Sequence, residues 1–254
     1  MGTLFGEEVE KRKQIGKSII EYKNVSSILT KTSGFMNGYD YTMNPYSGCS
    51  FGCTYCYAAF FSRSDDKKNN WGYWIDVKEN ALSLLIKLRR KPLIKKTIYI
   101  SSVTDPYQPI EKELELTRSL LKELSEYHKP IIVIQTRSPL VTRDLDLFKR
   151  FDKIQINMTI TTDSEEVRKI FEPLCPSNKV RLNAIKEIND SGINACITMT
   201  PLLPIKNAEE FAKQLLETEI KKFIVQPFHS ERGKFIAGTR EEAMKLVKEM
   251  NWNR

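Results

Sequence analysis

A regular alternation of strand-like and helix-like segments is the feature of this sequence that most constrains its fold. Short runs rich in Val, Ile, Tyr and Thr, a composition typical of β-strands, are separated by segments with apolar residues at helical spacing. We expect strands at 41–46, 97–102, 131–136, 154–161, 193–200 and 222–226. Because most of these runs are continuously apolar and alternate with helices, they predict parallel βαβ units in an α/β fold.

The length of the chain fits one such domain. The 254 residues match an α/β barrel in size, and no long linker rich in Gly, Ser or Pro divides them. Residues 41–254 are therefore expected to form a single barrel domain. Residues 1–40, which contain no clear strand–helix pair, are expected to be an N-terminal extension packed on the barrel.

Composition excludes several classes of protein. Hydrophobic residues make up 41% of the chain and charged residues 28%, which is incompatible with an extended disordered chain. The longest apolar runs have the length of a strand, so no membrane-spanning helix is expected. The first 14 residues lack the apolar core of a secretory signal, and we expect the cytoplasm, where thiols stay reduced.

The cysteines indicate a metal group. Cys49, Cys53 and Cys56 lie within eight residues in a C-x3-C-x2-C pattern flanked by Gly48 and Gly52. Three thiolates on one tight loop are able to hold three irons of a [4Fe–4S] cube, which leaves the fourth iron open to a small molecule. A structural zinc site needs four closed ligands, and no second Cys or His pair is present. Chance clustering of buried cysteines is the remaining alternative.

The other cysteines and the histidines add no second cluster. Cys196 lies in an apolar run and is expected to be a packed core residue, whereas Cys175, in Leu-Cys-Pro-Ser, is expected to be more exposed. His128 and His229 each stand alone in the sequence.

The C-x3-C-x2-C pattern after a first strand, with Tyr55 before the last cysteine, resembles the radical S-adenosylmethionine (SAM) superfamily. The resemblance implies a partial (β/α)6 TIM-like barrel and an open iron chelated by the amino and carboxylate groups of SAM. It further implies that one electron cleaves the S–C5′ bond and yields a 5′-deoxyadenosyl radical that takes a hydrogen atom from a substrate. An electron donor such as flavodoxin or ferredoxin is then required.

A longer set of motifs resembles the spore photoproduct lyase-like, or DNA repair photolyase-like, branch. In order along the chain the motifs are Asn-Pro-Tyr-x-Gly-Cys (44–49), Thr-Asp-Pro-Tyr-Gln-Pro (104–109), Thr-Arg-Ser (136–138), Thr-Ile-Thr-Thr-Asp (159–163), Glu-Pro (172–173) and Pro-Leu-Leu-Pro (201–204). One departure matters. Where such lyases carry a cysteine that donates a hydrogen atom, this chain has Ser102, and a hydroxyl is a much poorer donor.

Several candidate cofactor-binding residues fall at the carboxyl ends of the expected strands, where parallel barrels bind their ligands. Thr104 and Asp105 follow the second strand and are candidates for the ribose or the methionyl ammonium, with a plain Asp-Pro turn as the alternative. Arg137 ends the third strand and is a candidate partner of the SAM carboxylate, with a surface salt bridge as the alternative.

Further candidates lie on later strands and beside the cysteines. Thr159 and Thr161 point to the same face and are candidates for the ribose, with β-propensity as the alternative. The backbone of Thr200 is a candidate contact of the adenine. Tyr57 covers either the adenine or the cluster in this hypothesis, or is an ordinary core aromatic. Glu172 and Arg181 are candidates for a mutual ion pair.

The net charge of +8 permits, without requiring, a nucleic acid substrate. A radical SAM enzyme acting on a peptide or small molecule is an alternative. A non-catalytic iron–sulfur protein for redox sensing or electron transfer is another, but such a protein has no need of hydroxyls and an arginine at strand ends. The sequence does not decide the oligomeric state.

Overall fold

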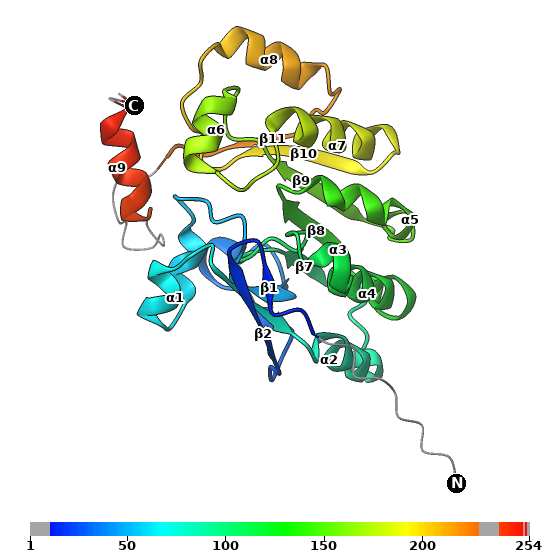
Figure 1. Cartoon of the computed structure of the whole chain (residues 1–254). Helices are drawn as coiled ribbons and strands as arrows, with labels where there is room; N and C mark the ends of the chain where they lie inside the picture. Colours follow the sequence, from blue (N-terminus) through cyan, green and yellow to red (C-terminus); the bar gives the residue numbers. More distant parts are fainter. Residues whose placement is uncertain (1–10, 229–238, 251, 253–254) are drawn as a thin grey trace.

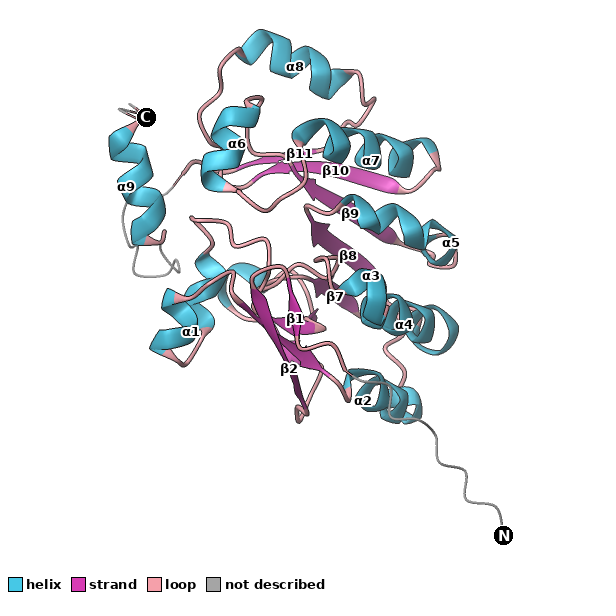
Figure 2. Cartoon of the chain, in the orientation of Figure 1, coloured by secondary structure: helices cyan, strands magenta, loops and turns pink. Residues whose placement is uncertain are grey.

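The computed structural model describes residues 11–228, 239–250 and 252, and it contains two sheets (Figures 1 and 2). The larger sheet has the strand order β11-β10-β9-β8-β7-β4-β3. Its strands are β3 (Leu29–Lys31), β4 (Tyr41–Met43), β7 (Thr97–Ile100), β8 (Ile131–Thr136), β9 (Ile154–Thr159), β10 (Asn194–Met199) and β11 (Phe223–Val225). Six of these strands are parallel, and β3 pairs antiparallel with β4 at one edge.

Helices follow the parallel strands in the expected alternation and line the large sheet in Figure 1. The helices are α1 (Asp65–Asn69), α2 (Ala81–Lys87), α3 (Glu111–Leu114), α4 (Leu116–Glu123), α5 (Leu145–Phe148), α6 (Glu165–Phe171), α7 (Asn178–Asp190), α8 (Ala208–Leu216) and α9 (Glu241–Glu249). The six parallel strands do not close on themselves in the part of the chain that is described. The fold is therefore a partial (β/α)6 barrel, as expected.

A second, four-stranded sheet stands beside the barrel. Its order is β1-β2-β6-β5, with strands β1 (Gln14–Ile15), β2 (Ser18–Lys23), β5 (Tyr46–Ser47) and β6 (Trp74–Lys78). The sequence patterns did not predict this sheet. It takes β1 and β2 from the N-terminal extension and β5 and β6 from beyond residue 40, and the domain boundary at that residue stays a prediction.

The expectation of one strand over 41–46 is wrong. The chain leaves the large sheet after Met43 and joins the small sheet at Tyr46. Asn44 explains the break, because its side chain accepts from the backbone N–H groups of Ser102 (2.9 Å) and Val103 (3.2 Å). Pro45 adds to it, because proline has no N–H to donate to a ladder. The other five runs form strands with ends that differ by up to two residues.

The main core lies between the large sheet and the helices that cover it. It is built from aliphatic side chains such as Ile98, Ile132, Ile156 and Ile185, all without exposed surface. α7 packs against β9 and β10, α2 against α4, and α6 against α9. A separate apolar cluster joins the cysteine segment to α6 and α9, so the C-terminal helix covers the region that the cysteine pattern singles out.

Candidate functional site

The three clustered cysteines lie on a loop between β5 and a 3-10 helix at Tyr57–Phe61. Two glycines shape this loop. Gly48 has φ +75, and a Cβ there would lie 2.4 Å from the backbone oxygen of Trp74. Gly52 has φ +56, and a Cβ there would lie 3.1 Å from the Cα of Gly72. The loop therefore needs glycine at both positions, because any side chain meets backbone strain together with a close neighbour.

The loop is tied to the ends of neighbouring elements on two sides. The Thr104 hydroxyl donates to the carbonyl of Gly48 (2.6 Å), and the backbone N–H of Ser50 donates to Gln108 Oε1 (3.0 Å). On the other side, the backbone N–H of Thr54 donates to the carbonyl of Phe171 (2.9 Å). Thr104 thus fastens the cysteine loop.

The three thiols differ in their surroundings. Burial raises the pKa of Cys49 well above its ordinary value and that of Cys56 to about 11. The pKa of Cys53 is lowered instead, because its sulfur has a hydrogen-bond contact with Cys175 and lies beside the cation of Arg137. Cys53 is therefore the thiol whose environment most favours the thiolate, the form that binds metal.

Arg137 lies at the centre of this arrangement. Its Nη1 donates to Cys53 Sγ (3.0 Å), and its Nη2 donates to the Tyr55 hydroxyl (3.3 Å). The surface salt bridge that was the alternative for Arg137 does not form, since its contacts are with these buried residues. Its Nε is buried and has no hydrogen-bond partner among the described residues. A buried cation with an unsatisfied donor indicates room for an additional acceptor beside the cysteines.

Asp105 holds the strand end that carries Arg137. Its carboxylate accepts from the Thr136 hydroxyl (2.7 Å) and from the backbone N–H groups of Tyr107 and Arg137 (both 2.9 Å). Burial raises the pKa of Asp105, and these hydrogen bonds oppose that shift. The Asp105 carboxylate therefore binds groups of the protein itself, which agrees with the alternative of an Asp-Pro turn, and it positions Arg137.

Tyr55, Glu172 and Arg181 form a buried chain of polar contacts behind Arg137. The Tyr55 hydroxyl donates to Glu172 Oε1, and Arg181 Nη2 donates to Glu172 Oε2 (2.5 Å). Burial alone raises the pKa of Glu172, but the cations of Arg181 and Arg137 lower it to about 2. The predicted pairing of Glu172 with Arg181 is confirmed. The Thr161 hydroxyl also donates to Glu172 (3.0 Å), so it belongs to this chain of contacts.

Polar side chains that the sequence interpretation missed surround Thr159. Gln135 Nε2 donates to the hydroxyls of Thr159 (2.6 Å) and Thr198 (2.8 Å), and the Tyr99 hydroxyl donates to Gln135 Oε1 (3.1 Å). The only feature of the sequence that could have revealed these residues is their position, because Gln135 and Thr159 each lie within two residues of the carboxyl end of a strand. Thr200 follows β10 at its carboxyl end, directly before Pro201.

Tyr57 and Ser102 lie against each other beside the last cysteine. The Tyr57 hydroxyl donates to the backbone carbonyl of Ser102, and Asn44 Nδ2 donates to the Ser102 hydroxyl (3.0 Å). The residue Tyr57 is 47% exposed, so it is not an ordinary core aromatic. It packs edge-on against Phe61, which is also exposed.

Cys175 is buried, so the expectation that it is exposed is wrong. The guanidinium of Arg168 donates to its backbone carbonyl (2.8 Å) and draws the loop inward. Its Sγ lies 3.6 Å from Cys53 Sγ. Cys196 is fully buried in β10, as expected. His128 is buried beside Glu123, and His229 lies outside the described residues.

The residues of the cysteine loop fit an iron–sulfur cube. The loop supplies three thiols, and two buried polar atoms beside them, Arg137 Nε and Ser50 Oγ, lack partners among the described residues. Within the same part of the chain, no three His, Cys, Asp or Glu side chains converge on a site for one metal ion.

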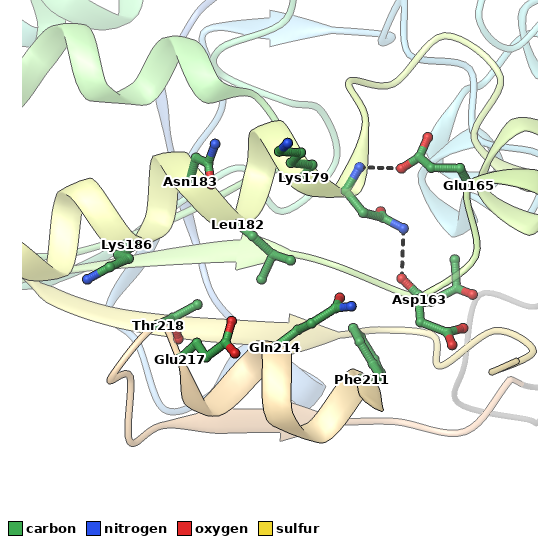
Figure 3. A pocket seen from close by; sticks show the side chains of 12 residues that line it. Asp163, Glu165, Lys179, Leu182, Asn183, Lys186, Phe211, Gln214, Glu217 and Thr218 are labelled. Carbon is green, nitrogen blue, oxygen red and sulfur yellow. Dashed lines mark hydrogen bonds between the residues drawn. The ribbon is translucent and has the colours of Figure 1, made fainter. Parts of the chain in front are cut away.

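A well-defined cavity lies away from the cysteines. It has a volume of about 400 Å³ and opens between α7 and α8 (Figure 3). Its lining is mostly polar and charged, with Lys179, Lys186 and Gln214 together with the ring of Phe211. The cysteines are not among its lining residues. In the described chain, no helix has the length and apolar character that a membrane span requires.

Comparisons with known proteins place these features in a family. The model of the Radical SAM superfamily matches residues 43–215. Uncharacterized protein MJ0683 of Methanocaldococcus jannaschii is 41% identical over 66% of this chain and 62% of its own length. The radical SAM Nalpha-GlyT isomerase of Pseudomonas phage M6 is 26% identical over 63% of this chain and 32% of its own length.

A double mutant of spore photoproduct lyase, solved with AdoMet and a dinucleoside spore photoproduct bound, has a similar fold. The TM-score is 0.59 at 19% identity, and the match covers 82% of this chain and 61% of that one. The chain thus spans less than two thirds of the length of these relatives.

Proposed function

This chain belongs to the radical SAM superfamily, and from that premise we propose that it is an enzyme that cleaves SAM reductively to start a radical reaction. The observation that carries the proposal is the site itself. Three thiols lie on one glycine-shaped loop, and one of them, Cys53, contacts a partly buried arginine whose Nε is unsatisfied among the described residues.

Cys49, Cys53 and Cys56 would hold a [4Fe–4S] cluster and leave one iron open to SAM. When bound, such a cluster would supply the single electron for reductive cleavage of SAM. The protein keeps water away from this chemistry, because Cys49 and Cys53 are buried and α9 packs over the loop.

Arg137 would neutralise the charge that accumulates at the site. Its guanidinium is fixed by Cys53 and Tyr55, while the backbone beside it is held by Asp105. The free Nε offers a donor to a carboxylate, and such charge-assisted hydrogen bonds are the strong ones. Arg137 is therefore our candidate for holding the SAM carboxylate, with Asp105 as its positioning residue.

The remaining candidates divide by their contacts. Thr159 and Thr200 lie at the carboxyl ends of β9 and β10, and we propose them for the ribose and the adenine. Tyr57, half exposed beside Cys56, is proposed to cover the adenine or the cluster. Thr104, Tyr55 and Thr161 are bonded to the loop or to Glu172, which supports an indirect role in cofactor binding.

We propose a nucleic acid as the substrate, on the strength of the +8 charge and the fold shared with spore photoproduct lyase. A peptide or small molecule remains the rival substrate. Ser102, which offers a hydroxyl where a thiol donor is expected, supports a reaction other than thymine-dimer reversal. A flavodoxin or ferredoxin is the proposed electron donor, and the cytoplasm is the proposed location.

Anaerobic reconstitution tests the enzyme proposal. The chain is loaded with iron and sulfide, reduced with dithionite and incubated with SAM, and 5′-deoxyadenosine is quantified. We expect product from the wild type and from Cys196→Ala, and none from Cys49→Ala, Cys53→Ala or Cys56→Ala. A loaded cluster that yields no 5′-deoxyadenosine would overturn the proposal in favour of a non-catalytic iron–sulfur protein.

Salt dependence tests the substrate class. Phosphate contacts release counterions, so the affinity for DNA or RNA oligonucleotides should fall steeply as salt is raised. No binding at low salt, or an affinity that does not change with salt, would favour a peptide or small molecule as the substrate. Neither result would count against cleavage of SAM.

A further inference from the structure

Cys175 is a buried thiol that the proposed chemistry leaves without a role, yet it contacts a proposed cluster ligand. Its sulfur lies 3.6 Å from that of Cys53. Both side chains are almost completely buried and belong to the apolar cluster that also contains Cys49. Cys196 is equally buried, but its sulfur contacts a backbone carbonyl of its own strand.

The contact is fixed from both sides by the backbone. On the cysteine loop, the hydroxyl and backbone N–H of Thr54 both donate to the carbonyl of Phe171, at 3.2 and 2.9 Å. Beyond α6, one nitrogen of Arg168 donates to the carbonyls of Glu172 (2.9 Å) and Cys175 (2.8 Å). Thr54 directly follows Cys53, and Arg168 holds the backbone of Cys175. The two sulfurs therefore have little freedom to separate.

Cys53 also has a second neighbour that donates, since Arg137 Nη1 lies 3.0 Å from the same sulfur. A metal-bound cysteine has no proton, so its sulfur accepts hydrogen bonds and Cys175 is the partner that donates. Donors to a ligand sulfur withdraw electron density and stabilise the more negative, reduced state of an iron–sulfur cluster.

We propose that Cys175 is a positioning residue that donates an S–H hydrogen bond to Cys53 and raises the reduction potential of the cluster. The proposal rests on the proposed function, because it presupposes that Cys53 is a cluster ligand. Arg137 and Cys175 then both donate hydrogen bonds to Cys53, so Cys53 is the thiolate whose negative charge the protein stabilises most.

Potentiometric titration followed by electron paramagnetic resonance tests this without any turnover. Cys175→Ala should make the midpoint potential more negative, with the equilibrium constant for reduction falling roughly tenfold, which is about 59 mV for a one-electron couple. Cys175→Ser, which keeps a donor, should stay close to the wild type. Cys196→Ala is the matched control for loss of a buried thiol, and its potential should not move.

A spectroscopic signature gives a second measurement on the unmodified chain. After exchange into D2O, electron–nuclear double resonance of the reduced wild-type cluster should lose a proton coupling that is already absent in Cys175→Ala. If that variant does not fold, Cys175→Val, which is close to cysteine in size and also lacks a donor, provides the same comparison.

The outcomes separate the inference from its premise. A wild-type chain that assembles no [4Fe–4S] cluster overturns both. A cluster whose potential and proton couplings are the same in wild type and Cys175→Ala overturns the inference alone. A wild-type spectrum that SAM does not perturb, but that becomes sensitive to SAM in Cys175→Ala, would make Cys175 a fourth ligand and also overturn it.

Discussion

The guanidinium of Arg137 donates to the sulfur of Cys53 across 3.0 Å and so joins the end of β8 to a loop 84 residues earlier in the sequence. One side chain thereby links a proposed cluster ligand with the proposed anchor of SAM. A change at Arg137 is expected to affect cosubstrate binding.

Replacing Arg137 by Gln should weaken SAM binding by about one to two orders of magnitude, because charge-assisted hydrogen bonds contribute about 1.5–3 kcal/mol. The perturbation that SAM causes in the resonance spectrum of the reduced cluster measures the affinity. Arg150→Gln is the control, since Arg150 makes an exposed pair with Glu126. Equal affinities in the two variants would remove Arg137 from the SAM site.

Gly48→Ala should disrupt the cysteine loop. The new Cβ meets the Trp74 backbone oxygen at 2.4 Å in a backbone with positive φ, so strain adds to a clash and the cost should exceed about 3 kcal/mol. Gly192→Ala isolates the strain, because that glycine also has positive φ but no neighbour within 4 Å of the added atom. Urea unfolding and iron content per chain are the measurements. Equal losses in both variants would show that the clash with Trp74 is relieved.

Glu172 should make the free energy of unfolding depend on pH in the acidic range. Its pKa is about 2 in the folded chain against an ordinary 4.5, so its contribution is complete above pH 4.5 and is lost as the pH falls through about 2. The shift corresponds to a contribution on the order of 3 kcal/mol. Glu172→Gln, which leaves Arg181 buried without its counter-charge, should lower the free energy of unfolding at neutral pH by about 3–5 kcal/mol.

The difference in the free energy of unfolding between wild type and Glu172→Gln should then narrow as the pH falls from 4.5 to 2. Denaturant titrations at several pH values measure this difference. A difference that is constant over this range would mean that the carboxylate titrates near its ordinary pKa.

The cluster-free chain should form a disulfide between Cys53 and Cys175 when treated with diamide. The two thiols lose two protons and two electrons to the diamide, and their sulfurs must close from 3.6 Å to about 2.05 Å. Peptide mapping should find this pair cross-linked in the wild type and in Cys196→Ser, and absent in Cys175→Ser. Free thiols at both positions after full oxidation would contradict the geometry of the pair.

Continuously apolar strands were predictable from the sequence, and strands that mix apolar with charged residues were not. Ile131–Thr136 forms a strand with the expected bounds, because a β-branched run between polar ends leaves little choice. The second sheet was missed for two reasons. β1 and β5 contain only two residues each, and β2 and β6 mix apolar with charged side chains, so they lack the continuous apolar run that marks the large sheet.

In the candidate site, the positions of residues along the chain were predictable and their contacts were not. Spacing alone identified the cysteine loop and the strand-end residues around it. Spacing does not reveal what a side chain contacts, so Asp105 and Thr161 were assigned to a ligand although they bond to protein groups. Cys175 was expected to be more exposed than Cys196 because it lies in Leu-Cys-Pro-Ser rather than in an apolar strand, yet Arg168 holds its backbone carbonyl and the side chain is buried.

The link from β4 to β5 consists of Asn44 and Pro45 alone, and both are held, Asn44 to the backbone after β7 and the carbonyl of Pro45 to the N–H of Lys78 (3.1 Å). Splitting the gene at this link, or circularly permuting the chain there, would leave the cysteine loop without its covalent connection to β4 of the large sheet. Complementing fragments cut at 62–64, beyond the cysteines, should reassemble far more readily than fragments cut at 44–45.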